Sequence, residues 1–263
     1  MRKRINTVVA DWLRRNSASV LIVVGLLVWW ELYSRFFNPR GNAYFPSIAF
    51  VIDQTLNYQG LILRGIRITF LEIVTGYALA VVIAIPAGIV VSKSMVIRQS
   101  SMPFLVYAYS LPAAILAPIF VLWFDSYVVA ASVFVAWVSF FPILINTITG
   151  FSHVRQELYH LGEVFGATPS QFVRKIEFWE AFPYSASGLK VAVQQAIVGA
   201  IVIEFIATTG GLGYLIVNAL DLLRQGLLFG VLIIIICFAV IFYNLTAWLI
   251  SSVTPPLSQQ RSH

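Results

Sequence analysis

Residues 228–250 have the sequence "LFGVLIIIICFAVIFYNLTAWLI", and this stretch decides the fold because it contains no charged side chain. About 20 consecutive apolar residues in a helix cross the roughly 30 Å hydrocarbon core of a bilayer. The composition agrees, because 59% of the 263 residues are hydrophobic and 11% are charged, whereas soluble domains are about half apolar and about a quarter charged. We therefore expect an all-α membrane protein.

Five further apolar blocks are long enough to cross the membrane, which gives about six transmembrane helices. Prolines interrupt the third and fourth spans, and membrane helices tolerate proline where neighbouring helices satisfy the freed carbonyl groups. Because of these prolines, the boundaries of the third span are the least defined. The five blocks are 19–37, 68–91, 102–124, 127–149 and 184–208.

Basic residues between the spans predict the orientation. They concentrate in the N-terminal segment, in the connection after the second span and in residues 150–183. Because positive charge is retained on the cytoplasmic side, both termini are expected in the cytoplasm of a multi-pass inner-membrane protein. No basic stripe suggests nucleic-acid binding. The residues behind the prediction are Arg2, Lys3, Arg4, Arg14, Arg15, Lys93, Arg98, Arg155, Arg174 and Lys175.

The segments outside the spans are too short to build a second core, so one transmembrane domain is expected over 19–251. Within the N-terminal segment 1–18, apolar residues at helical spacing in 5–16 predict an amphipathic helix lying on membrane lipid. Residues 38–67 are expected to form an extracytoplasmic loop, and 252–263 a cytoplasmic tail. The single cysteine, Cys237, lies in the last span and cannot form an intramolecular disulfide.

The most polar passage, "HLGEVFGATPSQFVRKIEFWEAFPYSASGLK" at 160–190, belongs to the predicted cytoplasmic loop 150–183. It predicts two short helices, with Gly166 at the turn and Thr168 capping the second helix, which Pro183 is expected to end. Phe172, Ile176 and Trp179 are expected on one face of that second helix. As a pattern, the helix-turn-helix fits two roles about equally: a linker packed on the membrane helices, or a docking element for a cytoplasmic partner.

The passage "GATPSQFVRKIEFWEAFPYSASGLK" resembles the EAA-type loop of type I ABC importer permeases, in particular the nitrate, sulfonate, taurine and thiamine-pyrimidine group. Two other stretches are similar to motifs of the same family: "SLPAAILAPIFVLWF" at 110–124 and "EFIATTGGLGYLI" at 204–216. The chain departs from the family where His160, Leu161 and Gly162 replace E-A-A, and where Trp179 replaces a proline. The matching positions in the loop are Gly166, Ala167, Ile176, Pro183, Gly188, Leu189 and Lys190.

The resemblance implies a subunit that conducts a small, often anionic or polar solute, delivered by a periplasmic or lipid-anchored binding protein. ATPase subunits would bind the 150–183 loop, and ATP and Mg would be held there, because this chain lacks a G-x-x-x-x-G-K-[ST] motif and is not expected to be an enzyme or to carry a cofactor. A second permease subunit is expected, and the altered E-A-A positions suggest a heterodimer rather than a homodimer. The residues expected to couple to the ATPase are His160, Leu161, Gly162, Gly166, Ala167, Thr168, Ile176 and Pro183.

Polar side chains inside spans are candidates for the translocation path, because burying them in a membrane is costly. For Glu204, a structural hydrogen bond near the outer interface is the slightly favoured role. No metal site is expected, because the histidines lack partners at ligand spacing. A stand-alone secondary transporter is the alternative function, and the substrate is not specified by these residues. The path candidates are Glu204, Gln194, Gln195, Glu72 and Asn146.

Overall fold

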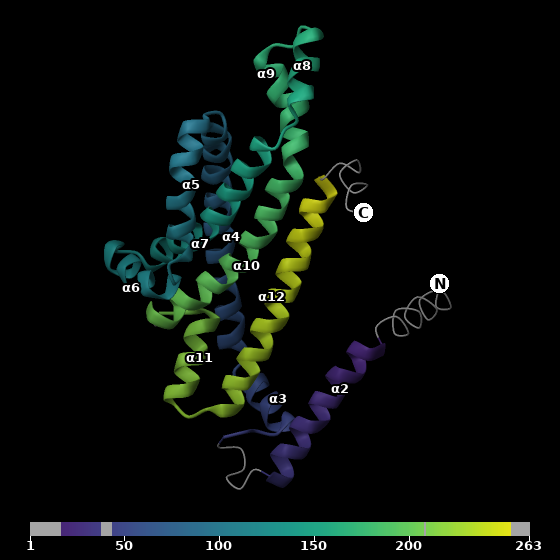
Figure 1. The fold of residues 1–263 in the computed structure, drawn as a ribbon. Coiled ribbons are helices and arrows are strands. Elements are labelled where there is room, and N and C mark those ends of the chain that lie inside the picture. The colour runs from purple at the N-terminus through teal and green to yellow at the C-terminus, as the bar shows by residue number, and fades with distance from the viewer. Residues whose placement is uncertain (1–16, 38–43, 208, 254–263) are drawn as a thin grey trace. The chain divides into compact units, whose positions relative to one another are not determined.

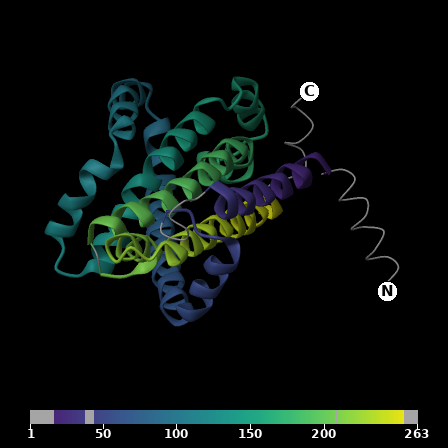
Figure 2. The ribbon, with the colours of Figure 1, turned by 90° about the horizontal axis from the view of Figure 1, so that it is seen from below.

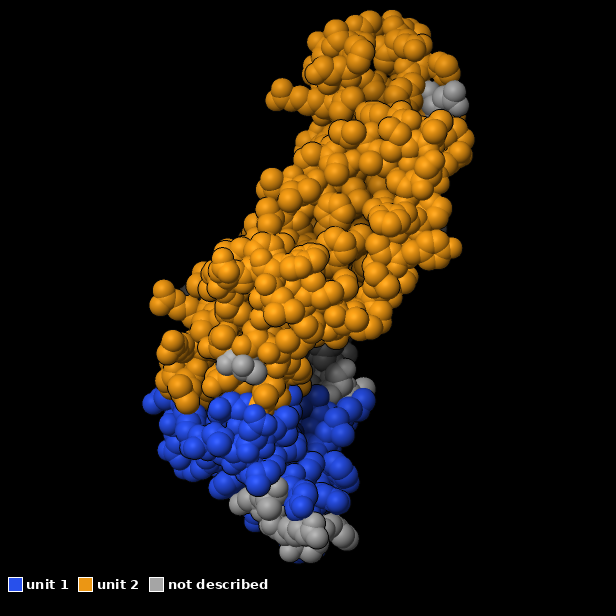
Figure 3. Space-filling view, turned by 90° about the vertical axis from the view of Figure 1, so that its left-hand side faces the viewer, with its two compact units in different colours: residues 1–59, 218–232 blue, residues 60–217, 233–263 orange. Residues whose placement is uncertain are grey.

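The computed structural model describes residues 17–37, 44–207 and 209–253, and within these ranges all the regular elements are helices. The chain divides into two compact units, coloured separately in Figure 3. The first comprises residues 1–59 and 218–232, and the second comprises residues 60–217 and 233–263. An all-helical membrane fold is therefore confirmed.

The first unit is held together by aromatic rings and by hydrogen bonds to a turn. Helix α2 (Ser17–Leu32) continues into the π-helical turn η1 (Tyr33–Phe37), and α3 (Ile48–Asn57) follows. The Trp30 indole donates a hydrogen bond to the Pro46 carbonyl at 2.8 Å, and its ring packs 5.3 Å from that of Phe229. Glu31 accepts a hydrogen bond from the Ile48 backbone at 3.0 Å, so the start of α3 is fixed to α2.

The second unit contains the long helices and the elements described below as functional (Figure 1). Seen along a second direction in Figure 2, α7 and α10 remain side by side. The elements that make up or enter this unit are α4 (Gln59–Ser92), α5 (Met95–Ser110), α6 (Ala113–Trp123), α7 (Tyr127–Ser152), α8 (Gln156–Val164), α9 (Pro169–Phe172), η3 (Val173–Glu177), α10 (Phe178–Ala207), α11 (Gly211–Asp221) and α12 (Gln225–Val253).

Helix α7 forms the centre of the second unit. In its most apolar stretch of 18 residues 61% is buried, against 28% in the corresponding stretch of α4. Glycines let its neighbours approach closely, as is usual where membrane helices pack. A Cβ placed on Gly76 of α4 would lie 2.6 Å from the Ser132 carbonyl of α7, and one on Gly188 of α10 would lie 2.7 Å from the Pro142 carbonyl. Residues larger than glycine at these two positions would push α4 and α10 away from α7.

Four of the described helices are long and apolar enough to span a membrane by themselves: α4, α7, the continuous helix over Pro169–Ala207, and α12. They coincide with four of the predicted spans. The predicted first span corresponds to α2 and η1, and α2 contains only 16 residues. It stays a prediction, as does the total of six spans.

The predicted third span, 102–124, is wrong as a single helix. Helix α5 begins at Met95, seven residues earlier, and α5 and α6 meet at an angle of 89°. Leu111 precedes Pro112 and has the extended backbone conformation, with ψ 131°. The cause is steric, because a proline ring disfavours the helical conformation of the residue before it.

Two other predictions are corrected by the structure. The loop predicted at 38–67 contains α3 and the first turns of α4. Pro183 does not end a helix but lies inside α10, and membrane helices tolerate proline at such positions. The glycine-rich stretch "TGGLGYLI" enters α11 at Gly211, whose φ of 96° is accessible to glycine. The predicted amphipathic helix over 5–16 and most of the predicted tail lie outside the described residues.

Candidate functional site

A hairpin formed by residues 155–177, called here the 155–177 hairpin, projects at one end of the second unit (α8 and α9 in Figure 1). Its turn is fixed by two caps. Gly166 has φ 66°, its amide donates to the Glu163 carbonyl at 3.0 Å, and the Ala167 amide donates to the Gly162 carbonyl at 2.9 Å. These bonds form a Schellman motif that ends α8. The turn predicted at Gly166 is thus present in the structure.

The second helix of the hairpin begins at the predicted Thr168 cap, which forms a capping box with Gln171. The Gln171 amide donates to Thr168 Oγ1 at 3.3 Å, and the Thr168 amide donates to Gln171 Oε1 at 3.0 Å. Pro169 occupies the first helical position, where its missing N–H costs no hydrogen bond. The local sequence therefore determines both sides of the turn.

A small aromatic core joins the two arms of the hairpin. Phe172 is 7% exposed, and its ring lies 4.4 Å from that of Tyr159 between centroids. A Cβ on Gly162 would lie 2.7 Å from the Phe172 ring, so glycine at this position lets the arms meet. The hairpin is consequently a packed unit and not an open loop.

The base of the hairpin contains a buried carboxylate, Glu177, whose side chain is 1% exposed. Lys93, in the connection between α4 and α5, donates to Glu177 Oε1 at 2.6 Å and also contacts Oε2. The Tyr159 hydroxyl donates to Oε1 at 3.2 Å. Burial, together with the charge of Glu177, raises the pKa of Tyr159 to about 12. One carboxylate therefore joins α8, η3 and the end of α4.

The tip of the hairpin exposes large apolar side chains. Phe165 is 83% exposed, Val164 80% and Leu161 50%. Polar residues flank them: His160 and Glu163 on α8 are themselves exposed, and their side chains lie 3.9 Å apart. An exposed apolar cluster bordered by polar residues is typical of a surface that binds another protein.

The structure brings some of the predicted coupling residues to this tip and separates others from it. His160, Leu161, Gly166 and Thr168 lie at or beside the turn, as do Gly162 and Ala167. Ile176 lies at the base and Pro183 within α10.

The pattern did not identify Glu177, because η3 is a π-helical turn. The extra residue of a π turn rotates the following side chains by about 100°. Glu177 is therefore buried, while Trp179, predicted on the apolar face, is 44% exposed.

Two side-chain hydrogen bonds from α4 and one from Lys93, which directly follows α4, reach the continuous helix over Pro169–Ala207. Thr69 donates to Glu204 at 2.5 Å, the Tyr77 hydroxyl donates to the Leu189 carbonyl at 3.1 Å, and Lys93 pairs with Glu177. Residue numbers rise from Thr69 to Lys93 while those of their partners fall from Glu204 to Glu177, so α4 and α10 are antiparallel. The hairpin is thereby attached to a pair of long helices that are bonded to each other along their length.

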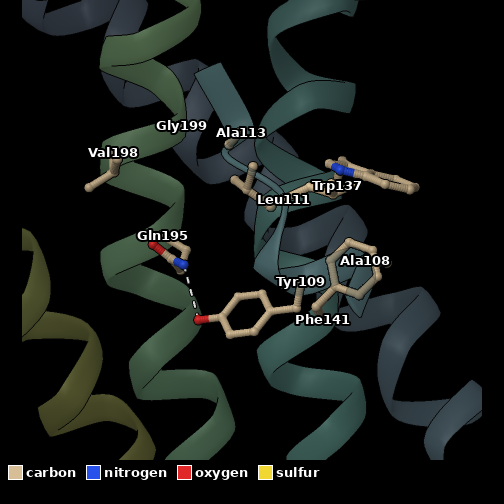
Figure 4. A pocket seen from close by; sticks show the side chains of 10 residues that line it. Ala108, Tyr109, Leu111, Ala113, Trp137, Phe141, Gln195, Val198 and Gly199 are labelled. Atoms are coloured by element: carbon tan, nitrogen blue, oxygen red, sulfur yellow. Dashed lines mark hydrogen bonds between the residues drawn. The ribbon is translucent and has the colours of Figure 1, made fainter. Parts of the chain in front are cut away.

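A cavity of about 220 Å³ lies beside the break between α5 and α6 (Figure 4). Tyr109 from α5, Trp137 and Phe141 from α7 and Gln195 from α10 contribute its larger side chains. The Gln195 amide nitrogen donates to the Tyr109 hydroxyl at 3.0 Å. Gln195 was among the predicted path residues, whereas the aromatic residues were not. The proline at 112, which breaks the span here, is the sequence signal that could have indicated an opening.

The other predicted path residues do not line this cavity. Glu204 is fully buried and accepts hydrogen bonds from Thr69 and from the Gly213 amide at 2.6 Å. Asn146 donates to the Pro142 carbonyl of its own helix at 2.8 Å, and Gln194 is exposed.

Glu72 is 1% exposed, and its carboxylate oxygens accept no hydrogen bond from the described residues. It lies close enough to Glu204 for the two carboxyl groups to interact electrostatically. Across the described ranges, no three His, Cys, Asp or Glu side chains are arranged to hold a metal ion.

Comparison with known proteins assigns a family to this arrangement of helices. Residues 76–255 match the family described as binding-protein-dependent transport system inner membrane component, and the chain belongs to that family. It is 29% identical over 231 residues to a probable ABC transporter permease of Haemophilus influenzae, covering 88% of this chain and 94% of that protein. It is 30% identical over 196 residues to the formylaminopyrimidine transport permease of Halalkalibacterium halodurans, covering 74% and 77% of the two chains.

A solved structure confirms the fold. A chain of the MetNI methionine ABC transporter, in an inward-facing conformation, superposes with a TM-score of 0.66, covering 76% of this chain and 99% of that chain at 17% identity. The protein is thus a multi-pass membrane permease subunit of an ABC importer and not an enzyme, since the ATPase of such importers is a separate subunit. This settles the choice between a permease subunit and a stand-alone secondary transporter. The solutes after which the relatives are named differ from one another.

Proposed function

We propose that the 155–177 hairpin is the surface through which an ATPase subunit drives this permease. The observation that carries the proposal is the tip, where Leu161, Val164 and Phe165 are exposed on a hairpin that has its own core. Burying apolar side chains such as these in a groove of the partner would contribute about 1.5–3 kcal/mol each. A linker packed on membrane helices would instead turn this face inward.

The bonds between α4 and α10 support a route for the movement. A force on the tip reaches Glu177 through Phe172 and Tyr159, and from Glu177 it reaches both long helices. Helix α10 also carries Gln195, which lines the cavity beside the α5–α6 break. We propose that this cavity belongs to the translocation path and changes shape when the hairpin moves.

The remaining parts of the assembly follow from the family. A second permease subunit would complete the path, and the His160, Leu161 and Gly162 positions favour a different chain over a second copy. ATP and Mg would be bound by the ATPase subunits. The hairpin and both termini would face the cytoplasm, with the solute-binding protein on the opposite side of the inner membrane.

Two variants of Gly166 test the hairpin as the ATPase surface. Asn and Asp both tolerate a left-handed conformation and have nearly the same shape. Open space surrounds this position, since a Cβ there meets no atom within 4 Å. Gly166→Asp places a charge at an apolar contact and should abolish substrate-stimulated ATP hydrolysis by the assembled importer, while Gly166→Asn should retain most of it. Equal activity of Gly166→Asp and the unmodified protein would contradict the proposal.

A further inference from the structure

The cavity beside the α5–α6 break has walls suited to a flat ring. Tyr109, Trp137 and Phe141 contribute three aromatic side chains, with the Trp137 and Phe141 rings 4.9 Å apart and nearly perpendicular, at 85°. The Tyr109 ring lies 6.3 Å from that of Phe141. Aromatic walls of this kind stack against planar ligands and give adaptable, apolar contact.

The cavity also offers one hydrogen-bond donor next to one acceptor. Gln195 donates to the Tyr109 hydroxyl, as drawn in Figure 4. This leaves the amide oxygen of Gln195 as an acceptor and the hydroxyl hydrogen of Tyr109 as a donor. If the amide is turned over, its NH₂ becomes the donor and the Tyr109 oxygen the acceptor. Either arrangement presents a neighbouring donor and acceptor to a ligand.

Charge limits what can occupy this space. Among the ten described residues that line the cavity, none carries a formal charge. An anion in this cavity would exchange part of its hydration for uncharged groups without gaining a cationic partner, which is unfavourable. A small inorganic anion, a sulfonate or a carboxylate is therefore a poor occupant.

We propose that this cavity binds a planar, uncharged heterocycle whose edge carries adjacent hydrogen-bond donor and acceptor atoms, such as an aminopyrimidine or a cyclic amide. The proposal rests on the proposed function, because it identifies the class of solute that occupies the translocation path. The ring stacks on the aromatic walls, and its edge pairs with Gln195 and Tyr109. The cavity of about 220 Å³ suits a single ring with small substituents.

The test measures binding to the assembled importer by equilibrium dialysis, with cytosine and uracil as probes and with nitrate and ethanesulfonate as competitors. Gln195→Leu keeps the size of the side chain and removes both polar atoms, and Tyr109→Phe removes only the hydroxyl. Asn244→Leu is the matched control, because this exposed amide on α12 does not line the cavity and bonds to its own helix at 2.7 Å. Copurification of the ATPase and ATP hydrolysis are recorded for every preparation.

We expect saturable binding of at least one pyrimidine that Gln195→Leu weakens about tenfold, as the loss of roughly 1.4 kcal/mol of hydrogen bonding would produce. Tyr109→Phe should weaken it less, and Asn244→Leu should not change it. The inference is overturned if neither pyrimidine binds, if Gln195→Leu leaves the affinity for the probe unchanged, or if nitrate or ethanesulfonate displaces the probe. An importer that hydrolyses ATP and prefers an anion would overturn this inference alone, whereas a chain that fails to copurify with an ATPase would overturn the proposed function.

Discussion

Two buried glutamates at opposite ends of one continuous helix are stabilised in different ways. Glu177, at the base of the 155–177 hairpin, pairs with the Lys93 ammonium group. Glu204, near the other end of α10, accepts hydrogen bonds from the Thr69 hydroxyl and the Gly213 amide, which are neutral. The bonds from Lys93 and Thr69 connect the two ends of this helix to α4, since Lys93 directly follows α4 and Thr69 lies within it.

The two glutamates are stabilised differently because the two ends of the helix differ in their access to water. The Lys93 side chain is 43% exposed, so its charge keeps contact with water while it neutralises Glu177. Glu204 is fully buried near the end of α10, where an unpaired lysine would be costly and where backbone and hydroxyl donors are already in place. The hairpin end therefore depends on a charge pair, and the far end depends on hydrogen bonds.

The largest effect is expected at the charge pair. Lys93→Met leaves the buried Glu177 carboxylate with Tyr159 alone and should destabilise the protein by roughly 3 kcal/mol. Glu177→Gln leaves a lysine that can reach water, so it should cost about 1 kcal/mol or less. The double variant should resemble Glu177→Gln, because no buried charge then remains. Thermal unfolding of the detergent-purified proteins measures all three, and additive effects would show that the pair is not coupled.

A smaller effect is expected at the far end. Glu204→Met removes both acceptor oxygens and leaves the buried Gly213 amide without its acceptor, which should cost about 2 kcal/mol. Glu72→Met is the matched control, because its carboxylate receives no hydrogen bond from the described residues. It should leave the thermal midpoint unchanged or raise it. If both variants were destabilised equally, the bonds from Thr69 and Gly213 would not explain the role of Glu204.

The smallest expected effect is on how the stability of the protein changes with pH. The pKa of Tyr159 is raised to about 12, from about 10 in an unfolded chain. A raised pKa means that the folded protein keeps this proton longer, so the contribution is complete below about pH 10 and disappears as the pH rises toward about 12. Tyr159→Phe, which cannot titrate, should lose less stability than the unmodified protein across this range. Parallel alkaline losses in the two proteins would exclude this contribution.

Much of the fold could be predicted from the sequence, because local signals decide it. Apolar length defined the helices α4, α7, α10 and α12, and the residues Thr168, Pro169 and Gln171 defined the turn of the hairpin. The α5–α6 bend was harder to predict. Pro112 indicates a break in the helix, but the angle of 89° depends on packing. Composition alone could not separate a broken span from a kinked one.

The site was harder to predict, because it depends on contacts between distant residues. Lys93 and Glu177 are 84 positions apart, and Tyr109 and Gln195 are 86 apart. The π-helical turn also displaced Glu177 from the position that regular helical spacing assigns to it. Of the predicted path residues, Gln195 lines the cavity, while Glu204 bonds within the chain.

The account depends most on contact between the hairpin tip and an ATPase subunit, and site-specific cross-linking measures that contact directly. The single cysteine, Cys237, is first replaced by serine. In that background, Val164→Cys places a thiol at the tip and Leu122→Cys places one on α6, at positions that are 80% and 83% exposed. A short thiol-to-amine cross-linker applied to the assembled importer should join position 164, and not position 122, to the ATPase. No product from position 164 in an importer that hydrolyses ATP, or equal products from both positions, would contradict the account.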